Sequence, residues 1–243
     1  MIKIYEVIRV IDRQPIFLVE HLHRMQQSLA HYPGEHQLDL PYLKQQVETL
    51  ARQHETGNFN VRIEYDLEQA SYGFYAVAGV YPTPEMYRDG VVLVTFPHQR
   101  HDPNVKVYDA SLRDAMDEKK AQYQAFDLLY IHDGVTSEAS KSNIFFIKNN
   151  QLYTSPDEAV LKGITRMKAL ESADDLGIVV HKRPIMVDEL VDFEGAFLSG
   201  TSLHLLPINR IDQHRYRPDH PVWQALNEQF DKKIVQEVDR QDL

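Results

Sequence analysis

Residues 134–153 read "GVTSEASKSNIFFIKNNQLY", and this stretch decides the fold. It predicts two strands around a kink, with Glu138 at the kink, and residues 143–153 predict a hairpin. A glutamate at the end of a strand is most simply solvated. Hydroxyl side chains surround this one, however, and would suit a buried, hydrogen-bonded carboxylate. These hydroxyl residues are Thr136, Ser137, Ser140 and Ser142.

Strands and helices are interspersed on both sides of this stretch. The patterns predict strands at residues 2–11, 59–65, 71–81, 90–96, 105–108, 127–132, 134–138, 143–148, 151–154, 178–185 and 195–201. They predict helices at residues 20–31, 41–54, 111–125, 164–176 and 221–238. No βαβ ladder emerges, so the fold class is α+β. The polar, turn-rich segment 97–104 predicts a boundary between a small N-terminal domain, residues 1–100, and a larger C-terminal domain, residues 101–243.

Composition excludes several classes of function. The net charge of -10 argues against non-specific nucleic-acid binding, which requires a basic surface. The chain has no cysteine, so disulfides, thiolate metal sites and cysteine nucleophiles are excluded. No apolar run reaches the ~18–20 residues of a membrane span, and the N-terminus has no signal-peptide core, so a cytoplasmic protein is expected. Motifs of zincins, serine hydrolases, Rossmann proteins and P-loop proteins are absent from the sequence.

Two lysines differ from the others because each lies between β-branched residues, Lys3 in "IKI" and Lys106 in "VKV". A lysine desolvated in an apolar strand has a lowered pKa, and its neutral amine is a nucleophile that can form a Schiff base. The alternative is an ordinary strand with one solvent-exposed face, on which the lysine would lie. Of the two, Lys106 is the better candidate, because Lys3 is close to the chain end.

Two loops of small residues are candidate anion sites. In "LKGITR", residues 161–166, Gly163 permits a tight turn, and the amides of Ile164 and Thr165 open a helix. The simpler alternative is that Thr165 only caps that helix. The loop "SGTS", residues 199–202, follows an apolar strand and could hold phosphate oxygens, or it could be a plain turn.

The segment "EHLHR" places Glu20 and Arg24 one helical turn apart, which by itself predicts a surface ion pair. His21 and His23 would point to different sides of that helix and make a poor metal pair. No metal site is expected from the spacing of the histidines.

In this order along the chain, "EHLHRMQQSL", "VKVYD", "TSEASKSNIF", "LKGITR" and "FLSGTSLHLLPI" resemble the class IV, or fold-type IV, aminotransferases. That family depends on pyridoxal 5'-phosphate (PLP) and includes branched-chain aminotransferases, D-amino-acid transaminases and 4-amino-4-deoxychorismate lyases. The resemblance covers nearly the whole chain. It implies a small N-terminal α/β domain, a larger C-terminal β-rich pseudo-barrel with helices, and a homodimer.

The resemblance also implies roles for individual residues. Lys106 matches the lysine that forms the Schiff base with PLP and then moves the substrate Cα proton. Glu138, 32 residues later, matches the acid that pairs with the pyridine nitrogen and keeps the ring an electron sink. Arg24 matches the H-x-x-R arginine that clamps the cofactor phosphate. The remaining phosphate contacts would come from Ile164, Thr165 and Thr201.

This sequence departs from the family pattern in three places. Family members usually carry an extra N-terminal strand and a glycine-rich turn, so a shorter small domain and a more open site are expected. The family often has Asn-Tyr shortly after the lysine, where this chain has "KVYDAS", so Tyr108 is the candidate substitute. The residues that hold the substrate carboxylate do not follow from the pattern. Arg62 is the first candidate and Arg100 the second, while a cross-strand ion pair is the alternative for Arg62.

Three functions remain open at this point. The leading one is a PLP-dependent aminotransferase that acts on an amino acid through Lys106 and transfers its nitrogen to a keto acid. The second is a PLP-dependent 4-amino-4-deoxychorismate lyase that releases pyruvate with the same lysine. The third is a non-catalytic protein with the same fold, which the short N-terminus suggests.

Overall fold

The computed structural model describes residues 3–33, 37–100, 103–106 and 113–239. Two compact units divide the chain. Unit 1 combines Met1–Val80, Asn104–Asp109 and Lys232–Leu243, and unit 2 combines Tyr81–Pro103 and Ala110–Asp231. These units differ from the expected division at residue 100, because the chain passes between them several times. The functional domains of residues 1–100 and 101–243 stay a prediction.

Unit 1 is built on a four-stranded sheet in the order β2-β1-β3-β4. The strands are β1 (Lys3–Ile11), β2 (Gln14–Pro15), β3 (Phe59–Asp66) and β4 (Ser71–Val77). All its pairings are antiparallel. Burial alternates strictly along β1, so one face of the sheet forms the core and the other face carries the half-buried side chains.

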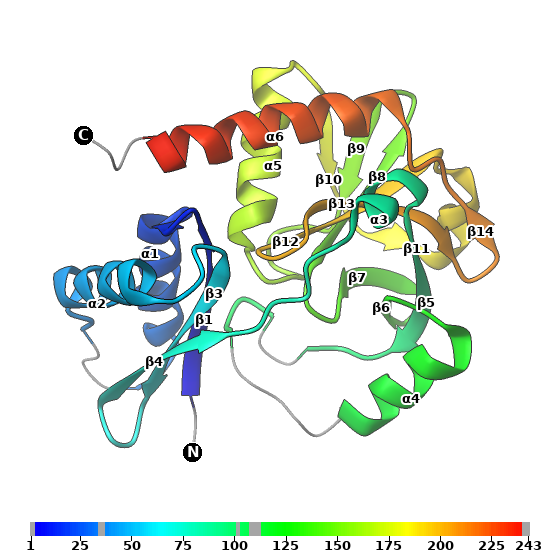
Figure 1. Cartoon of the computed structure of the whole chain (residues 1–243). Coiled ribbons are helices and arrows are strands. Elements are labelled where there is room, and N and C mark those ends of the chain that lie inside the picture. The colour runs from blue at the N-terminus through cyan, green and yellow to red at the C-terminus, as the bar shows by residue number, and fades with distance from the viewer. Residues whose placement is uncertain (1–2, 34–36, 101–102, 107–112, 240–243) are drawn as a thin grey trace. The chain divides into compact units, whose positions relative to one another are not determined.

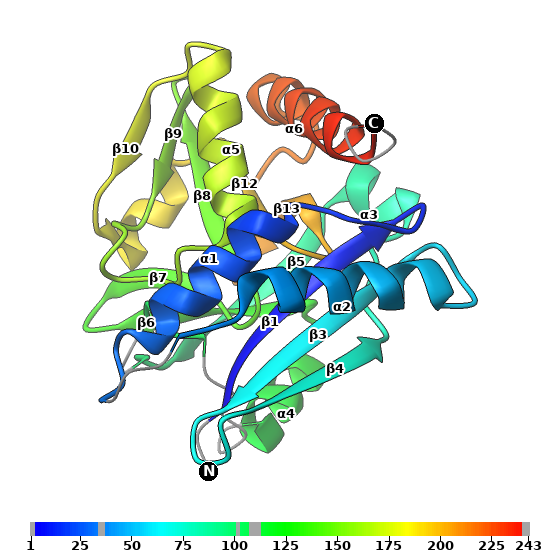
Figure 2. The same cartoon turned by 90° about the vertical axis from the view of Figure 1, so that its left-hand side faces the viewer.

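Helices α1 (Leu18–Leu29) and α2 (Leu40–Gln53) cover the core face of this sheet, as Figures 1 and 2 show. Asp39 caps α2 by accepting a hydrogen bond from the Tyr42 amide, and a proline occupies the first turn. The apolar stripe of each helix, which includes Met25 of α1 and Leu43 of α2, packs on the buried strand residues, among them Ile4, Ile8 and Val61. Unit 1 therefore has its own hydrophobic core.

Unit 2 contains a ten-stranded sheet in the order β10-β9-β8-β12-β13-β5-β6-β7-β11, with β14 paired to β13. Its strands are β5 (Val91–Pro97), β6 (Asp127–His132), β7 (Val135–Ala139), β8 (Asn143–Lys148), β9 (Gln151–Thr154), β10 (Val180–Lys182), β11 (Ile185–Met186), β12 (Gly195–Gly200), β13 (His204–Ile211) and β14 (His214–Arg215). The helices assigned to this unit are α3 (Pro84–Asp89), α4 (Arg113–Tyr123), α5 (Ile164–Asp175), a 3₁₀ turn (Val187–Asp192) and the first half of α6 (Pro221–Asp239). The long sheet curls on itself, with helices beside it (Figure 1). The α+β prediction is confirmed.

The opening stretch forms β7, a turn, and the β8–β9 hairpin. Asn149 and Asn150 both have positive φ, 53° and 58°, in the two-residue turn that joins Lys148 to Gln151. Asparagine tolerates this left-handed geometry, which matches the twist of the flanking strands. The expected hairpin is confirmed. The expected position of Glu138 at the kink is wrong, because Glu138 lies inside β7 and the chain turns at residues 140–142.

Other expectations differ at the level of single elements. Residues 105–108 were expected to form a strand, but Val105 and Lys106 have no strand assignment, and Tyr108 lies outside the described residues. The expected strand 178–185 is broken into β10 and β11, with Pro184 between them. Helix α3, which Thr83 caps, and strand β13 were not predicted. Along the described ranges, no helix has the length and apolar character needed to cross a membrane.

Candidate functional site

The first cluster of candidate residues lies in unit 1, around the buried acid Glu6. Glu6 has no exposed surface, and it accepts hydrogen bonds from Arg24 Nε at 2.8 Å and from His21 Nδ1 at 2.8 Å. Arg24 Nη2 contacts the second carboxylate oxygen as well. Burial lowers the pKa of His21, so the ring is neutral near pH 7 and carries its proton on the nitrogen that faces Glu6. Arg24 is therefore a buried residue and not part of a surface ion pair.

Arg24 comes from α1, whose start explains its position. The helix begins after Phe17, which adopts a left-handed conformation at φ 54° with no side-chain cap. The buried face of α1 includes His21, Arg24 and Met25 at helical spacing. Because Glu6 binds the Nε and Nη2 atoms of Arg24, a phosphate would have to bind the remaining edge of the guanidinium. Glu6 thus holds Arg24 in its orientation, and the sequence pattern did not reveal this partner.

Lys106 lies at the edge of the same sheet. Its carbonyl accepts a hydrogen bond from the Tyr5 amide of β1 at 3.3 Å. Its Nζ lies 5.4 Å from the centroid of the Tyr5 ring, and its charge acts on Glu6. Tyr5 and Glu6 are consecutive in β1 and so point to opposite faces of the sheet. Lys106 therefore interacts with side chains from both faces.

Arg62, the first candidate for the substrate carboxylate, shares the Tyr5 ring with Lys106. Its guanidinium carbon lies 4.5 Å from the ring centroid. Its Nε lies 2.7 Å from Glu64 Oε1, two residues along β3, so the ion pair runs along one strand and not across two. The alternation of β1 and β3 places Arg62 on the sheet face that carries Tyr5, opposite the face that α1 covers.

Lys3 does not have the properties of a neutral nucleophile. Its Nζ donates a hydrogen bond to Glu64 at 3.0 Å, and 39% of its side chain is exposed. The hydrogen bond and charge of Glu64 raise the pKa of Lys3 above its usual value. The ammonium form is favoured, which leaves Lys106 as the better candidate of the two.

The second cluster lies in unit 2, around Glu138. Only 5% of its side chain is exposed. Oε1 accepts from Arg100 Nη1 at 2.9 Å, and Oε2 accepts from Asn143 Nδ2 at 3.0 Å and from the Leu161 amide at 3.2 Å. Burial raises the pKa of Glu138, while the charge and hydrogen bond of Arg100 lower it in part. The interpretation as a solvated strand-end glutamate is wrong.

Asn143 joins Glu138 to the loop before α5, and its role was not foreseen from the sequence. Its amide group donates to Glu138 and also to the Leu161 carbonyl at 2.8 Å. A Cβ at position 163 would overlap Asn143 Oδ1, so only glycine fits there. The sequence does contain the acid, the asparagine and the glycine before the helix. The role of Asn143 follows only from its contact with position 163, which lies 20 residues away.

The start of α5 and the loop after β12 lie near Asn143. Gly163 is the N-cap residue of α5, and no side chain caps the helix, so Thr165 is not the cap. The amides of Ile164 and Thr165 are in the first turn, where intrahelical acceptors are lacking. On the other side, Ser199 pairs with Asn143 across β12 and β8, and Thr201 follows two residues later.

Two buried hydroxyl groups in this region have no hydrogen-bond partner among the described residues, those of Ser142 and Ser199. A Cβ at position 200 would lie 3.3 Å from the Ser142 Cβ, which is a tight approach. Buried polar atoms without partners are uncommon in folded proteins and call for an explanation such as a bound group. Together with the uncapped helix start, they define a polar cradle suited to an anion.

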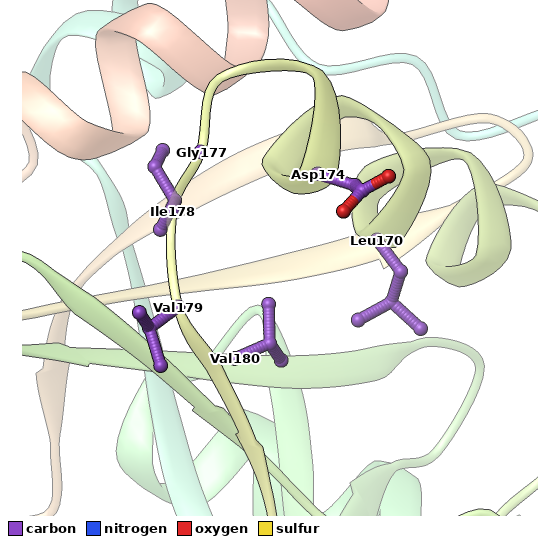
Figure 3. Close-up of a pocket in the computed structure, with 6 residues that line it drawn as sticks. All are labelled: Leu170, Asp174, Gly177, Ile178, Val179 and Val180. Atoms are coloured by element: carbon purple, nitrogen blue, oxygen red, sulfur yellow. The ribbon is translucent and has the colours of Figure 1, made fainter.

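A separate hollow of about 460 Å³ lies at the other end of α5, where the chain leads into β10 (Figure 3). It is lined by Leu170, Asp174, Gly177, Ile178, Val179 and Val180. Most of these side chains are apolar, and none of the predicted site residues is among them. Within the described parts of the chain, no cluster of His, Asp and Glu is arranged to hold a metal ion.

The structure thus groups the predicted site residues into two sets. In unit 1 it brings together Lys106, Arg24 and Arg62 around Glu6 and Tyr5. In unit 2 it links Arg100 to Glu138, and it places the α5 start and the 199–202 loop beside Asn143. The functional roles assigned to these residues stay predictions.

Comparisons with known proteins show which family the chain belongs to. Residues 3–211 match the family described as amino-transferase class IV. The D-alanine aminotransferase of Bacillus licheniformis is 25% identical over 222 residues, which cover 86% of this chain and 78% of that protein. A proposed branched-chain-amino-acid aminotransferase of Synechocystis sp. is 35% identical over 124 residues, 50% of this chain and 41% of that relative.

Solved structures share the fold. A candidate branched-chain amino acid aminotransferase from Thermotoga maritima superposes with a TM-score of 0.86 at 22% identity, over 96% of this chain and 86% of that one. A candidate 4-amino-4-deoxychorismate lyase from Legionella pneumophila gives a TM-score of 0.85 at 17% identity, over 95% and 91%. A hypothetical aminotransferase from Mycobacterium tuberculosis in its PLP-bound form gives 0.81 at 22% identity, over 97% and 89%. The chain has the fold of fold-type IV enzymes and belongs to the class IV aminotransferase family.

Proposed function

We propose that the protein is a PLP-dependent aminotransferase that moves the amino group of an amino acid to a keto acid, with Lys106 as its catalytic residue. The observation that carries this proposal is the cradle in unit 2. A carboxylate that is 5% exposed is fixed on both oxygens, next to an uncapped helix start. Such a cradle offers an acceptor for a protonated ring nitrogen and donors for a phosphate.

The residues present fit PLP in its charge as well as in its hydrogen bonds. The orphan hydroxyl groups of Ser142 and Ser199 and the uncapped amides of α5 favour an anion at this position. Ile164, Thr165 and Thr201 would hold the phosphate, with Arg24 adding a positive charge. Glu138 would accept a hydrogen bond from the pyridine nitrogen. When bound, PLP would supply an electron sink for the electrons left at the substrate Cα when its proton departs.

Within this scheme the chain's own groups divide the work. Lys106 would take the proton from the substrate Cα, which requires an amine that is neutral in the working enzyme. Arg62, on the same sheet face as Tyr5, would hold the substrate carboxylate. Arg100, the second candidate for that task, is already bound to Glu138.

Reduction with borohydride followed by peptide mapping tests the catalytic lysine. Protein incubated with PLP should acquire one stable pyridoxyl group, on Lys106, and Lys106→Met should acquire none. Lys3→Met is the matched control and should be labelled like the wild type. A label on Lys3, or no label at all, would refute the assignment.

The substrate is sought with a panel of amino donors and 2-oxoglutarate. The related aminotransferases suggest branched-chain amino acids and D-alanine as the first donors to test. Formation of glutamate from one of them supports the aminotransferase. A panel in which no donor transfers nitrogen, although Lys106 is labelled, would argue for another reaction.

The second candidate is a lyase of the 4-amino-4-deoxychorismate type, because a structure described as such an enzyme shares this fold over 95% of the chain. Elimination of pyruvate from 4-amino-4-deoxychorismate with no keto-acid acceptor would distinguish it from a transaminase. The non-catalytic alternative loses its support, since the family consists of enzymes.

We also propose a cytoplasmic homodimer without nucleic-acid or membrane partners. The net charge of -10 supports the lack of nucleic-acid binding. Light scattering coupled to size-exclusion chromatography measures the mass, for which twice 28.3 kDa is expected. A single peak at the monomer mass across micromolar concentrations would refute the dimer.

A further inference from the structure

Arg100 occupies a position that its predicted role does not explain. Its Nη1 donates to Glu138 Oε1 at 2.9 Å, and 26% of its side chain is exposed, against 5% for Glu138. The other carboxylate oxygen is bound by Asn143 and the Leu161 amide. The guanidinium therefore covers the carboxylate at its more open side. The observed contact of Arg100 is therefore with Glu138, and not with a group that could belong to a substrate.

A buried carboxylate needs such a partner to stay ionised. Burial raises the pKa of Glu138, and the charge and hydrogen bond of Arg100 are the largest effects in the opposite direction. The Leu161 amide and the charge of Arg166, which projects from α5, add smaller contributions of the same sign. Asn143 contributes a neutral donor from β8. Without Arg100, burial would still disfavour the ionised form of Glu138, and only the smaller effects of the Leu161 amide and the Arg166 charge would remain to oppose it.

We infer that Arg100 is a positioning residue that holds Glu138 as an ionised hydrogen-bond acceptor for the pyridine nitrogen of the cofactor, and does not bind the substrate carboxylate. This inference rests on the proposed function for the identity of the cofactor. The stabilisation of the Glu138 carboxylate by Arg100 does not depend on the cofactor and can be measured in the apoprotein. With Arg100 in place, a proton shared between Glu138 and the ring nitrogen resides on the nitrogen. Without Arg100, the carboxylate competes for that proton.

The apoprotein provides the first test, through the pH dependence of thermal unfolding. The folded pKa of Glu138 lies above its unfolded value of about 4.5. Between those values the native state binds more protons than the unfolded state, so stability falls as pH rises through this window. Arg100→Met raises the folded pKa further and extends the fall to higher pH. The melting-temperature deficit of Arg100→Met should therefore widen from pH 4.5 upwards.

A double-mutant cycle isolates this coupling. In a Glu138→Gln background, Arg100→Met should change the melting temperature by an amount that does not depend on pH. Arg88→Met, which breaks an exposed pair with Asp89, is the matched control and should show no widening with pH. Equal pH profiles for Arg100→Met with and without Glu138 would overturn the inference.

Kinetics and cofactor binding separate the two roles of Arg100. Mutation of the outer partners of metal-binding side chains typically costs about 10–100-fold in affinity or activity, and a loss of this size in kcat is expected for Arg100→Met. The KM for the amino donor should change by less than about threefold, since the substrate carboxylate is held elsewhere. Arg100→Lys keeps the charge and should recover most of kcat. A large rise in KM with kcat intact would assign Arg100 to the substrate instead.

The outcomes also distinguish failure of the inference from failure of the proposed function. Absorbance of the bound cofactor between pH 5 and 9 should titrate differently in Arg100→Met and in wild type, with Arg100→Lys resembling the wild type. If neither protein binds PLP but the pH-dependent coupling in the apoprotein is present, the proposed function fails and the Arg100–Glu138 coupling stands. Should PLP bind and the coupling be absent, the inference alone is overturned.

Discussion

Replacement of Glu6 by glutamine should destabilise the protein more than any exposed ion-pair substitution. Glu6 is fully buried and accepts from Arg24 Nε and His21 Nδ1, each at 2.8 Å. Glutamine has one acceptor oxygen and no charge, so Arg24 would remain buried without its counter-ion. Removal of one partner of a buried pair costs roughly 3–5 kcal/mol. We therefore expect Glu6→Gln to lose about 3 kcal/mol at pH 7.

Urea unfolding measures this loss. With an m-value of roughly 1–3 kcal/mol/M, the midpoint should fall by about 1–3 M. Glu48→Gln is the matched control, because Glu48 pairs with Lys44 on α2 at 3.6 Å and the lysine is 53% exposed. That pair runs along the helix surface and should contribute no more than about 0.5 kcal/mol. The midpoint of Glu48→Gln should hardly move.

The pH dependence gives a second, independent check. Burial raises the pKa of Glu6, but the charges of Arg24 and Lys106 and the hydrogen bond from His21 outweigh it and leave the pKa far below the ordinary value of 4.5. A depressed pKa means that the stabilisation is fully present above pH 4.5 and is lost as the pH falls towards the folded pKa. The gap between wild type and Glu6→Gln should be constant from pH 7 to pH 5 and narrow in acid. A gap below about 0.5 kcal/mol at pH 7, or one that widens in acid, would refute this account of the cluster.

Three further outcomes are expected. Glu138→Ala should keep the fold but lose turnover by about 10²-fold or more, and wild-type activity would disprove the role of this carboxylate. Gly163→Ala should cost about 1–3 kcal/mol in urea unfolding because its Cβ overlaps Asn143 Oδ1, and a neutral result would show that the loop yields easily. Lys106→Met should abolish transamination while Lys3→Met, whose ammonium pairs with Glu64, should retain more than about half of it. If both variants behave alike, the distinction between the two lysines fails.

The sequence predicted the class of the fold and most of its elements, because local periodicity reports which side of a strand or helix is buried. Helix α5 begins at Ile164 as expected, and the β8–β9 hairpin follows the predicted apolar run. Two of the errors concern local signals: Thr83 and a following proline start helix α3, and Pro184 separates β10 from β11. Strand β13, by contrast, pairs with β12 and with the distant β5, which a pattern of single residues does not record.

For the site, the sequence by itself determined which side chains are chemically suited: two lysines between apolar neighbours, one acid among hydroxyl residues and a glycine before a helix. It did not determine their partners. Only the tertiary structure decided that Arg24 pairs with Glu6, that Arg100 covers Glu138, and that Asn143 requires a glycine at position 163. The physical reason is that the charge state of a buried group depends on the few polar atoms within hydrogen-bond reach. Those atoms come from residues 18, 38 and 20 positions away, respectively, and are brought together only by the packing of strands and helices.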